Sequence, residues 1–239
     1  AQVNPLIHPQ FRHAMYFPQI ANVRNPRLLQ SMIGYLKQHP KVEFIEHCPI
    51  EQFNIVNGKV QSIRSQNKQI YFADQFVITT GAWSKHWSEQ LDLDIPVQPV
   101  QGQMVLFKTP ENWLPTMCMN KVMYLIPRLD GHVVCGSSMA NCGFDTTPTA
   151  ATQQTILAAC FEMVPELAAF PIVKQWAGLR PSSPTGVPYI GKMPELDNVW
   201  ANFGHFRNGL CMGPASARLL RQLILKQPTL LDPIAFCPT

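Results

Sequence analysis

The spacing of apolar residues separates the chain into helical and extended segments. A helix is predicted from Asn25, where an asparagine cap followed by Pro26 favours a helix start, and it ends before Pro40 because proline disfavours helix in the preceding residue. Apolar residues at helical spacing also predict helices over 147–163, behind a threonine cap, and over 213–226.

Short apolar or alternating runs predict strands along the rest of the chain. Asn57-Gly58 joins two such runs and predicts a two-residue hairpin, because both turn positions adopt positive φ. A second hairpin is predicted from 122–128 and 132–137, and 76–78 is expected to form a strand buried on both faces. Further strands are predicted over 42–48, 97–107, 172–180 and 199–205. This order of elements predicts an α+β (mixed α/β) fold.

The composition narrows the classes of partner. The 239 residues are 46% hydrophobic and 14% charged, and the net charge of +4 is scattered without a run of like charges. We therefore expect no nucleic-acid partner. The seven cysteines include no C-x-x-C pair, which favours neither a disulfide framework nor a metal site. Small buried thiols in a reducing compartment are expected instead.

The sequence also bears on location. No apolar run approaches the roughly 18 residues of a membrane span, and no signal peptide is visible. We therefore expect a cytoplasmic protein without a membrane span. The chain opens on a polar, irregular segment that does not begin with methionine, and we expect it to start inside a longer protein.

Two predicted strands end in residues suited to ligand contact. Thr80 and Gly81 follow the 76–78 run, where glycine would let a ligand approach the backbone, although composition alone favours a plain turn. Arg180 follows an apolar strand and precedes Pro181. A buried guanidinium needs a partner, which would be either an internal acid or a ligand carboxylate held by both arms of its fork.

A glycine-flanked loop, 203–210, leads into the last predicted helix. The first N–H groups of a helix point outward and its dipole favours negative charge, so the loop suits an anion or a polar ring. An ordinary helix start is the alternative. His205 and Arg207 make the loop polar, which favours a functional interpretation.

A tyrosine lies among apolar residues in the predicted strand 122–128. By strand alternation Tyr124 points to the same side as Val122 and Ile126, opposite Met123 and Leu125. Such a tyrosine is either part of the core, with its hydroxyl satisfied there, or part of a pocket lining.

Taken together, these segments resemble the glycine oxidase/D-amino-acid oxidase superfamily, most closely the glycine oxidases of the thiamine pathway. The resemblance rests on MYLIPR…GHVVCGSSM, WAGLRP…GVPYIG and GHFRNGLCMGPASARLL, in this order, and extends over almost the whole chain. It implies an antiparallel-sheet substrate domain and the C-terminal part of a Rossmann-like FAD domain. Residues 1–22 and 91–177 would belong to the substrate domain, and 23–90 and 178–239 to the FAD domain.

The resemblance also implies a chemistry and a set of roles. A small amine or amino acid, such as glycine, sarcosine or a D-amino acid, would be oxidised to the imine by hydride transfer to FAD. Arg180 would clamp the substrate carboxylate, Tyr124 would hydrogen-bond it or line the pocket, and Arg207 would lie near flavin and substrate. The cofactor-binding residues would be Ile50, through its main chain, and Thr80, Gly81, Gly204, His205, Phe206, Asn208, Gly209 and Leu210.

The sequence departs from the family at two points. Val122 stands where glycine oxidases carry a histidine two residues before Tyr124, and no G-x-G-x-x-G motif, which supplies the pyrophosphate site, occurs. We therefore expect this chain to bind FAD poorly by itself, and its bare apolar faces to favour a homo-oligomer. A quinone-linked D-amino-acid dehydrogenase and an assembly module without flavin or activity are the alternatives.

Overall fold

Two compact units make up residues 3–238, which the computed structural model describes. One unit comprises 3–22 and 100–179, and the other comprises 23–99 and 180–238. The helices are α1 (Asn25–Lys37), α2 (Ser84–Gln90), α3 (Ala150–Met163) and α4 (Gly209–Ile224). The strands are β1 (Ile50–Val56), β2 (Lys59–Ser65), β3 (Ile70–Tyr71), β4 (Phe76–Ile78), β5 (Gln98–Lys108), β6 (Cys118–Met119), β7 (Tyr124–Arg128), β8 (His132–Gly136), β9 (Ile172–Ser182), β10 (Tyr189–Lys192) and β11 (Val199–Phe203).

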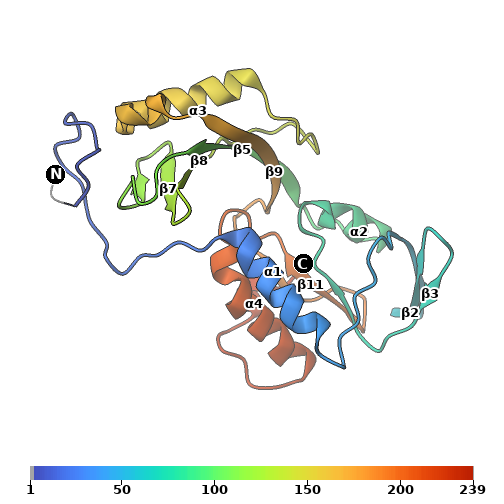
Figure 1. The fold of residues 1–239 in the computed structure, drawn as a ribbon. Coiled ribbons are helices and arrows are strands. Elements are labelled where there is room, and N and C mark those ends of the chain that lie inside the picture. Colours follow the sequence, from blue (N-terminus) through green and yellow to red (C-terminus); the bar gives the residue numbers. More distant parts are fainter. Residues whose placement is uncertain (1–2, 239) are drawn as a thin grey trace. The chain divides into compact units, whose positions relative to one another are not determined.

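A five-stranded sheet and one long helix form the first unit. Its strand order is β6-β7-β8-β5-β9, and β6, β7, β8 and β5 pair antiparallel. The helix α3 runs along one face of this sheet (Figure 1), where Leu125, Val133 and Ile156 belong to one buried core. The alternate positions of the strands, including Tyr124, therefore face away from α3.

Local sequence explains the elements of this unit. Gly131, at φ +71°, closes the β7–β8 hairpin by donating its N–H to the carbonyl of Arg128 at 3.1 Å. The hydroxyl of Thr149 accepts the N–H of Thr152 at 3.3 Å and caps α3. The predicted hairpin is confirmed. The helix α3 is capped by a threonine, but by Thr149 and not at the predicted start, because it begins at Ala150, three residues later than predicted.

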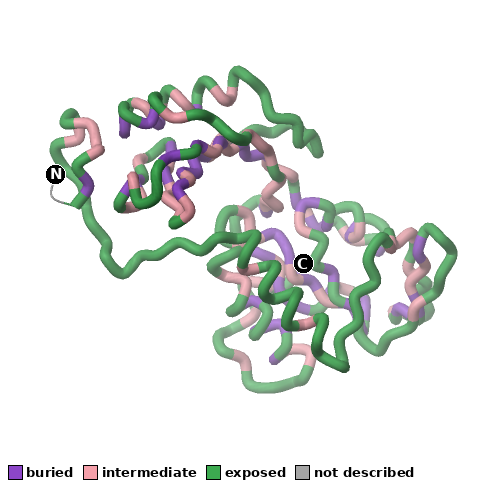
Figure 2. The backbone as a smooth tube through the Cα atoms, in the orientation of Figure 1, coloured by how far each residue is buried: buried purple, intermediate pink, exposed green. Residues whose placement is uncertain are grey.

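Two three-stranded sheets and the other three helices form the second unit. In the sheet β10-β11-β4, β11 runs antiparallel to β10 and parallel to β4. One face of this sheet shares a core with Val60 of β2, and α4 packs on the other face through Leu219 and Leu220 against Ile190. The buried positions of this unit lie in its strands, in α2 and α4 and in the connecting segments, whereas α1 contains no buried residue (Figure 2).

The hairpin of β1 and β2 forms as its turn sequence predicts. Asn57 has φ +49° and Gly58 has φ +71°, and the strands pair antiparallel from Val56 opposite Lys59 onward. These two residues tolerate positive φ better than other types, so the turn position is set locally.

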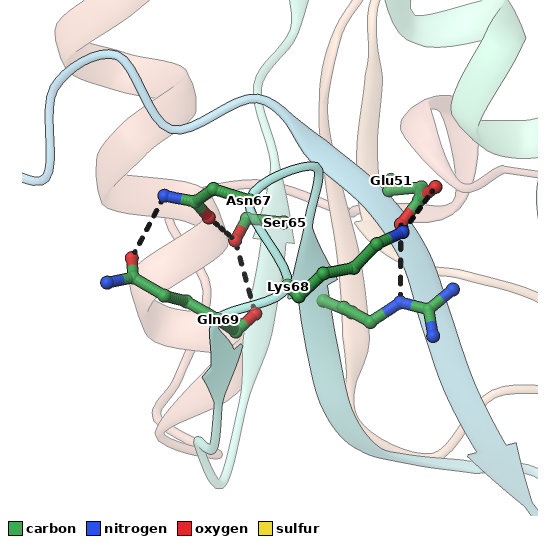
Figure 3. A network of polar contacts seen from close by, with 6 residues as sticks. Glu51, Ser65, Asn67, Lys68 and Gln69 are labelled. Carbon is green, nitrogen blue, oxygen red and sulfur yellow. Dashed lines mark hydrogen bonds and ion pairs between the residues drawn. The ribbon is translucent and has the colours of Figure 1, made fainter.

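An ion-pair network joins this hairpin to the next turn (Figure 3). Glu51 lies 3.1 Å from the Lys68 ammonium and 3.3 Å from the Arg64 Nε. The hydrogen bond from Lys68 is the main cause that lowers the pKa of Glu51. Ser65 donates to the carbonyl of Gln69 at 3.2 Å and tightens the turn. Because these groups are largely exposed, the ion pairs add little stability.

Two predicted features of strands are wrong. The segment 42–48 forms no strand, and its side chains Phe44 and Ile45 are exposed. A strand needs a partner for its hydrogen bonds, and no described strand pairs with this segment, so its apolar pattern was misleading. The strand β4 is buried on one face only, since Val77 is 43% exposed on the face that the described residues leave uncovered.

Two helix starts also differ from the prediction. The cap of α1 is Arg24, which makes no side-chain cap hydrogen bond, and Asn25 is already helical. The helix α4 begins at Gly209 rather than at 213, with Pro214 inside it. Proline has no N–H to donate to the carbonyl four residues earlier, so it is best tolerated close to a helix start. The turn before Pro214 is already helical, and α4 therefore starts earlier than predicted.

Other sequence expectations concern cysteines and membrane spans. All seven cysteines are free; Cys118, Cys135 and Cys160 are buried, whereas Cys142, Cys211 and Cys237 are exposed and Cys48 is half-buried. The expectation of buried thiols therefore holds for three of them. Among residues 3–238, no helix combines the length and apolarity that crossing a membrane requires.

Candidate functional site

The loop between β11 and α4 contains two residues with positive φ. Gly204 has φ +82° and Phe206 has φ +49°. A side chain at position 204 would meet the ring of Tyr189 at 3.3 Å, so glycine is required by both space and conformation. Two backbone hydrogen bonds hold the loop. The N–H of Phe206 donates to the Pro181 carbonyl at 2.8 Å, and the N–H of Asn208 donates to the His205 carbonyl at 3.0 Å.

The start of α4 offers backbone donors. Its cap, Asn208, makes no side-chain hydrogen bond, and the first N–H to find an intrahelical acceptor is that of Met212, at 2.9 Å from the Asn208 carbonyl. The N–H groups of the first turn therefore face outward, where the positive end of the helix dipole attracts negative charge.

His205 adds a polar atom to the same loop. Its Nε2 is buried and has no partner among the described residues, and its ring lies beside Gly209, where a Cβ would be 3.3 Å from the histidine Cβ. Burial lowers the pKa of His205, so the imidazole is neutral at physiological pH. Because a buried polar atom without a partner is costly, this nitrogen suits hydrogen bonding to a bound group.

Thr80 and Gly81 lie at the same edge of the sheet as this loop. The strand β4 runs parallel to β11, with Ile78 opposite Ala201, so both strands end at one edge. Thr80 is fixed by a 3.1 Å hydroxyl contact with Ser84, and Gly81 has φ +58°. The carboxyl edge of parallel strands is the usual ligand site of such sheets. The structure thus brings together two segments that the sequence predicted to bind a cofactor.

The last residues of β9 lie against this loop. Ser182 forms an antiparallel bridge with His205, and the Pro181 carbonyl accepts the N–H of Phe206. Arg180 is half-buried in β9, two residues before the bridged Ser182. Arg207 is exposed in the turn that follows His205. A guanidinium group near this loop is suited to binding a carboxylate.

Tyr124 lies in the first unit, at the start of β7. Its neighbours Met123 and Leu125 are 4% and 0% exposed, whereas Tyr124 is half-buried on the other face, as alternation predicts. Its hydroxyl donates to the Sδ of Met104 on β5 at 3.2 Å. In the sheet, Tyr124 and Met104 both pair with the same residue of β8, Gly136. The sequence interpretation did not include Met104 or Gly136, because only the strand register brings them to Tyr124.

Ile50 lies apart from the β4–β11 edge. It starts β1 and pairs with Ser65 in the other three-stranded sheet, β1-β2-β3. Of the predicted cofactor residues, the structure therefore groups those at 80–81 with those at 204–210 and places Ile50 on a separate sheet.

Comparisons with known proteins decide the family. The family model of FAD dependent oxidoreductases matches residues 1–223. The chain is an FAD dependent oxidoreductase family member. The chain is 43% identical to glycine oxidase of Pseudomonas putida over 234 residues, and the match covers 98% of this chain and 64% of that protein. It is 41% identical over 228 residues to glycine oxidase of Pseudomonas aeruginosa, covering 95% of this chain and 62% of that protein.

Solved structures of similar fold support the same family assignment. Glycine oxidase from Geobacillus kaustophilus matches with a TM-score of 0.74 at 26% identity, covering 80% of this chain and 52% of that chain. L-proline dehydrogenase from P. horikoshii, at 23% identity and a TM-score of 0.76, shares the fold. These matches confirm the predicted family resemblance and the mixed α/β fold. The chain spans less than two thirds of the length of these curated relatives.

The residues present fit part of the FAD that the family implies. The uncapped start of α4 and the unpartnered Nε2 of His205 suit the polar pyrimidine edge of a flavin ring. No G-x-G-x-x-G motif occurs in the sequence, so the chain supplies no pyrophosphate site of that kind. These residues therefore suit the ring of FAD and not its diphosphate.

Proposed function

We propose that the protein is an FAD-dependent oxidase of a small amino acid or amine that carries a carboxylate, with glycine-like substrates. The observation that carries this proposal is the antiparallel approach of the Arg180 strand end to the Gly204–Leu210 loop. Its relatives in two Pseudomonas species are named glycine oxidase, which supports glycine-like substrates for this protein as well. In this proposal the unit with α4 binds the flavin, and the five-stranded sheet contributes to substrate binding.

The arginines bind the carboxylate. Arg180, half-buried at the end of β9, presents a planar fork that matches both carboxylate oxygens. Arg207, exposed in the turn after His205, adds positive charge and attracts the anionic end of the substrate. The arginines thereby orient the substrate for reaction. In the five-stranded sheet, the hydroxyl of Tyr124 is proposed to donate a hydrogen bond to a substrate carboxylate.

Backbone groups hold the cofactor. The N–H groups at Gly209 and Leu210, with Gly204, His205, Phe206 and Asn208 around them, bind the pyrimidine edge of the ring. Thr80 and Gly81 border it from the end of β4, and the main chain of Ile50 contacts the adenine side. FAD, when bound, supplies the redox chemistry by accepting a hydride from the substrate. The residues of this chain supply placement and charge.

The carboxylate clamp is tested on protein made from the complete gene. Changing Arg180 to alanine removes a pair of charge-assisted hydrogen bonds worth about 1.5–3 kcal/mol, so KM for glycine, sarcosine or D-alanine is expected to rise about 10- to 150-fold. Arg218→Ala is the matched control, because Arg218 is an exposed arginine of α4 outside the loop. Arg180→Lys keeps the charge without the fork and should fall between the two.

The outcome separates the alternatives. An unchanged KM for Arg180→Ala contradicts the clamp. Oxygen consumption and reduction of an artificial dye, measured side by side, distinguish an oxidase from an enzyme that passes its electrons to a quinone. A purified protein that releases no flavin on denaturation contradicts the enzymatic proposal as a whole.

A further inference from the structure

The hydroxyl of Tyr124 has an unusual partner. It donates to the thioether sulfur of Met104 at 3.2 Å, and no oxygen or nitrogen of the described residues accepts it. Thioether sulfur is a weak acceptor, so this hydrogen bond orients the hydroxyl without binding it strongly. A carboxylate oxygen is a much stronger acceptor for the same donor.

Gly136 makes this contact possible. The strand β8 lies between β7 and β5, and Gly136 pairs with Tyr124 on one side and with Met104 on the other. A Cβ at position 136 would overlap the Met104 Sδ and would lie 3.3 Å from the Tyr124 hydroxyl. The missing side chain of Gly136 therefore lets Met104 reach across the middle strand to the tyrosine.

The next positions on this sheet face are apolar, and the charged or polar residues Lys108, Arg128 and His132 follow at its far end. Leu106 of β5, Ile126 of β7 and Val134 of β8 alternate on the side away from α3, together with Met104 and Tyr124. Among the described residues, the Met104 sulfur is the acceptor of the tyrosine hydroxyl, so it determines the direction in which the O–H bond points.

We propose that Met104 is a positioning residue for Tyr124. Its thioether, admitted by Gly136, holds the hydroxyl in one orientation before the substrate arrives and releases it to the substrate carboxylate. The carboxylate then gains a donor whose side-chain conformation is already set, so less entropy is lost on binding. This inference rests on the proposed function, in which Tyr124 binds the carboxylate.

The test compares Met104→Leu with a matched control in protein made from the complete gene. Leucine keeps the volume and removes the acceptor, and such a swap rarely unfolds a protein. KM for glycine or sarcosine is expected to rise about 3- to 10-fold, the range of one modest hydrogen bond, while kcat stays within about twofold. Leu106→Met exchanges the same two residue types two positions along β5, away from Tyr124, and should leave KM unchanged.

A double-mutant cycle separates positioning from a structural effect. If Met104 acts through the hydroxyl, Met104→Leu has no further effect on KM once Tyr124 is phenylalanine. Additive effects in the cycle, or an unchanged KM for Met104→Leu in an active enzyme, overturn this inference alone. A wild-type protein that contains no flavin and oxidises none of these substrates overturns the proposed function and, with it, this inference.

Discussion

The side chain of Asn198 provides the sharpest test of how the second unit is held together. It is 1% exposed and precedes β11, the strand that ends at the Gly204 loop. Its Oδ1 accepts the N–H of Val60 at 2.9 Å, and its Nδ2 donates to the Val60 carbonyl at 2.8 Å and to the Asp74 carbonyl at 3.3 Å. One amide therefore joins the β1–β2 hairpin to the sheet of β4 and β11.

Changing Asn198 to alanine leaves the backbone groups of Val60, a residue 1% exposed, without partners. Each buried unpaired group costs about 1–3 kcal/mol. Two such groups, partly relieved by local rearrangement, lower the free energy of unfolding by about 3 kcal/mol. At roughly 3 °C per kcal/mol for a chain of this size, the thermal midpoint should fall by about 9 °C.

Thermal unfolding followed by circular dichroism measures this loss. Asn202→Ala is the matched control, since this asparagine lies on the same strand and its buried Oδ1 has no partner among the described residues. It should cost less than about 1 kcal/mol. If Asn198→Ala costs no more than the control, the hydrogen bonds to Val60 do not join the hairpin to the sheet as argued.

Two further predictions concern the core and the loop. Leu125→Ala removes a side chain that is fully buried between the five-stranded sheet and α3, and should lower the free energy of unfolding by about 2–5 kcal/mol in urea titrations, whereas the exposed Val122→Ala should change it by less than about 0.5 kcal/mol. Burial lowers the pKa of His205 below its usual 6.5, so the unfolded chain binds the proton more tightly and stability falls as the pH drops below about 6.5. The thermal midpoint should therefore drop more between about pH 7.5 and about pH 5.5 in the wild type than in His205→Asn; equal drops contradict the burial argument.

Local signals in the sequence were sufficient for some elements. Asn57-Gly58 specified its hairpin because positive φ is a property of two adjacent residues. The alternation around Tyr124 placed Met123 and Leu125 on the opposite side from Tyr124, and the structure buries these two because one buried face imposes a period of two. In both cases the determinant lies within a few residues.

Other features depend on partners far away in the chain. Asn198 and Val60 are 138 residues apart, and Met104 reaches Tyr124 across a third strand. The segment 42–48 has an apolar pattern and yet forms no strand, since no partner pairs with it. Sequence patterns state which face a residue prefers, whereas register and pairing determine which residue it meets.

Some features of the candidate site could likewise be predicted from the sequence, and others depend on packing. Gly204 and Arg180 were recognisable from the sequence as residues near strand ends, and the bridge between Ser182 and His205 shows how the end of β9 comes to lie against the loop. The unpartnered Nε2 of His205 could not be foreseen, because burial of a side-chain atom depends on the complete packing around it.

Anaerobic titration of the protein made from the complete gene tests the central claim most directly. The purified protein should show the visible absorption of oxidised flavin, and glycine or sarcosine should bleach it in the absence of oxygen. Arg180→Ala should keep the colour and require far more substrate for the same bleaching. A protein whose flavin absorption is absent, or is unchanged by every small carboxylate-bearing amine tested, contradicts the account.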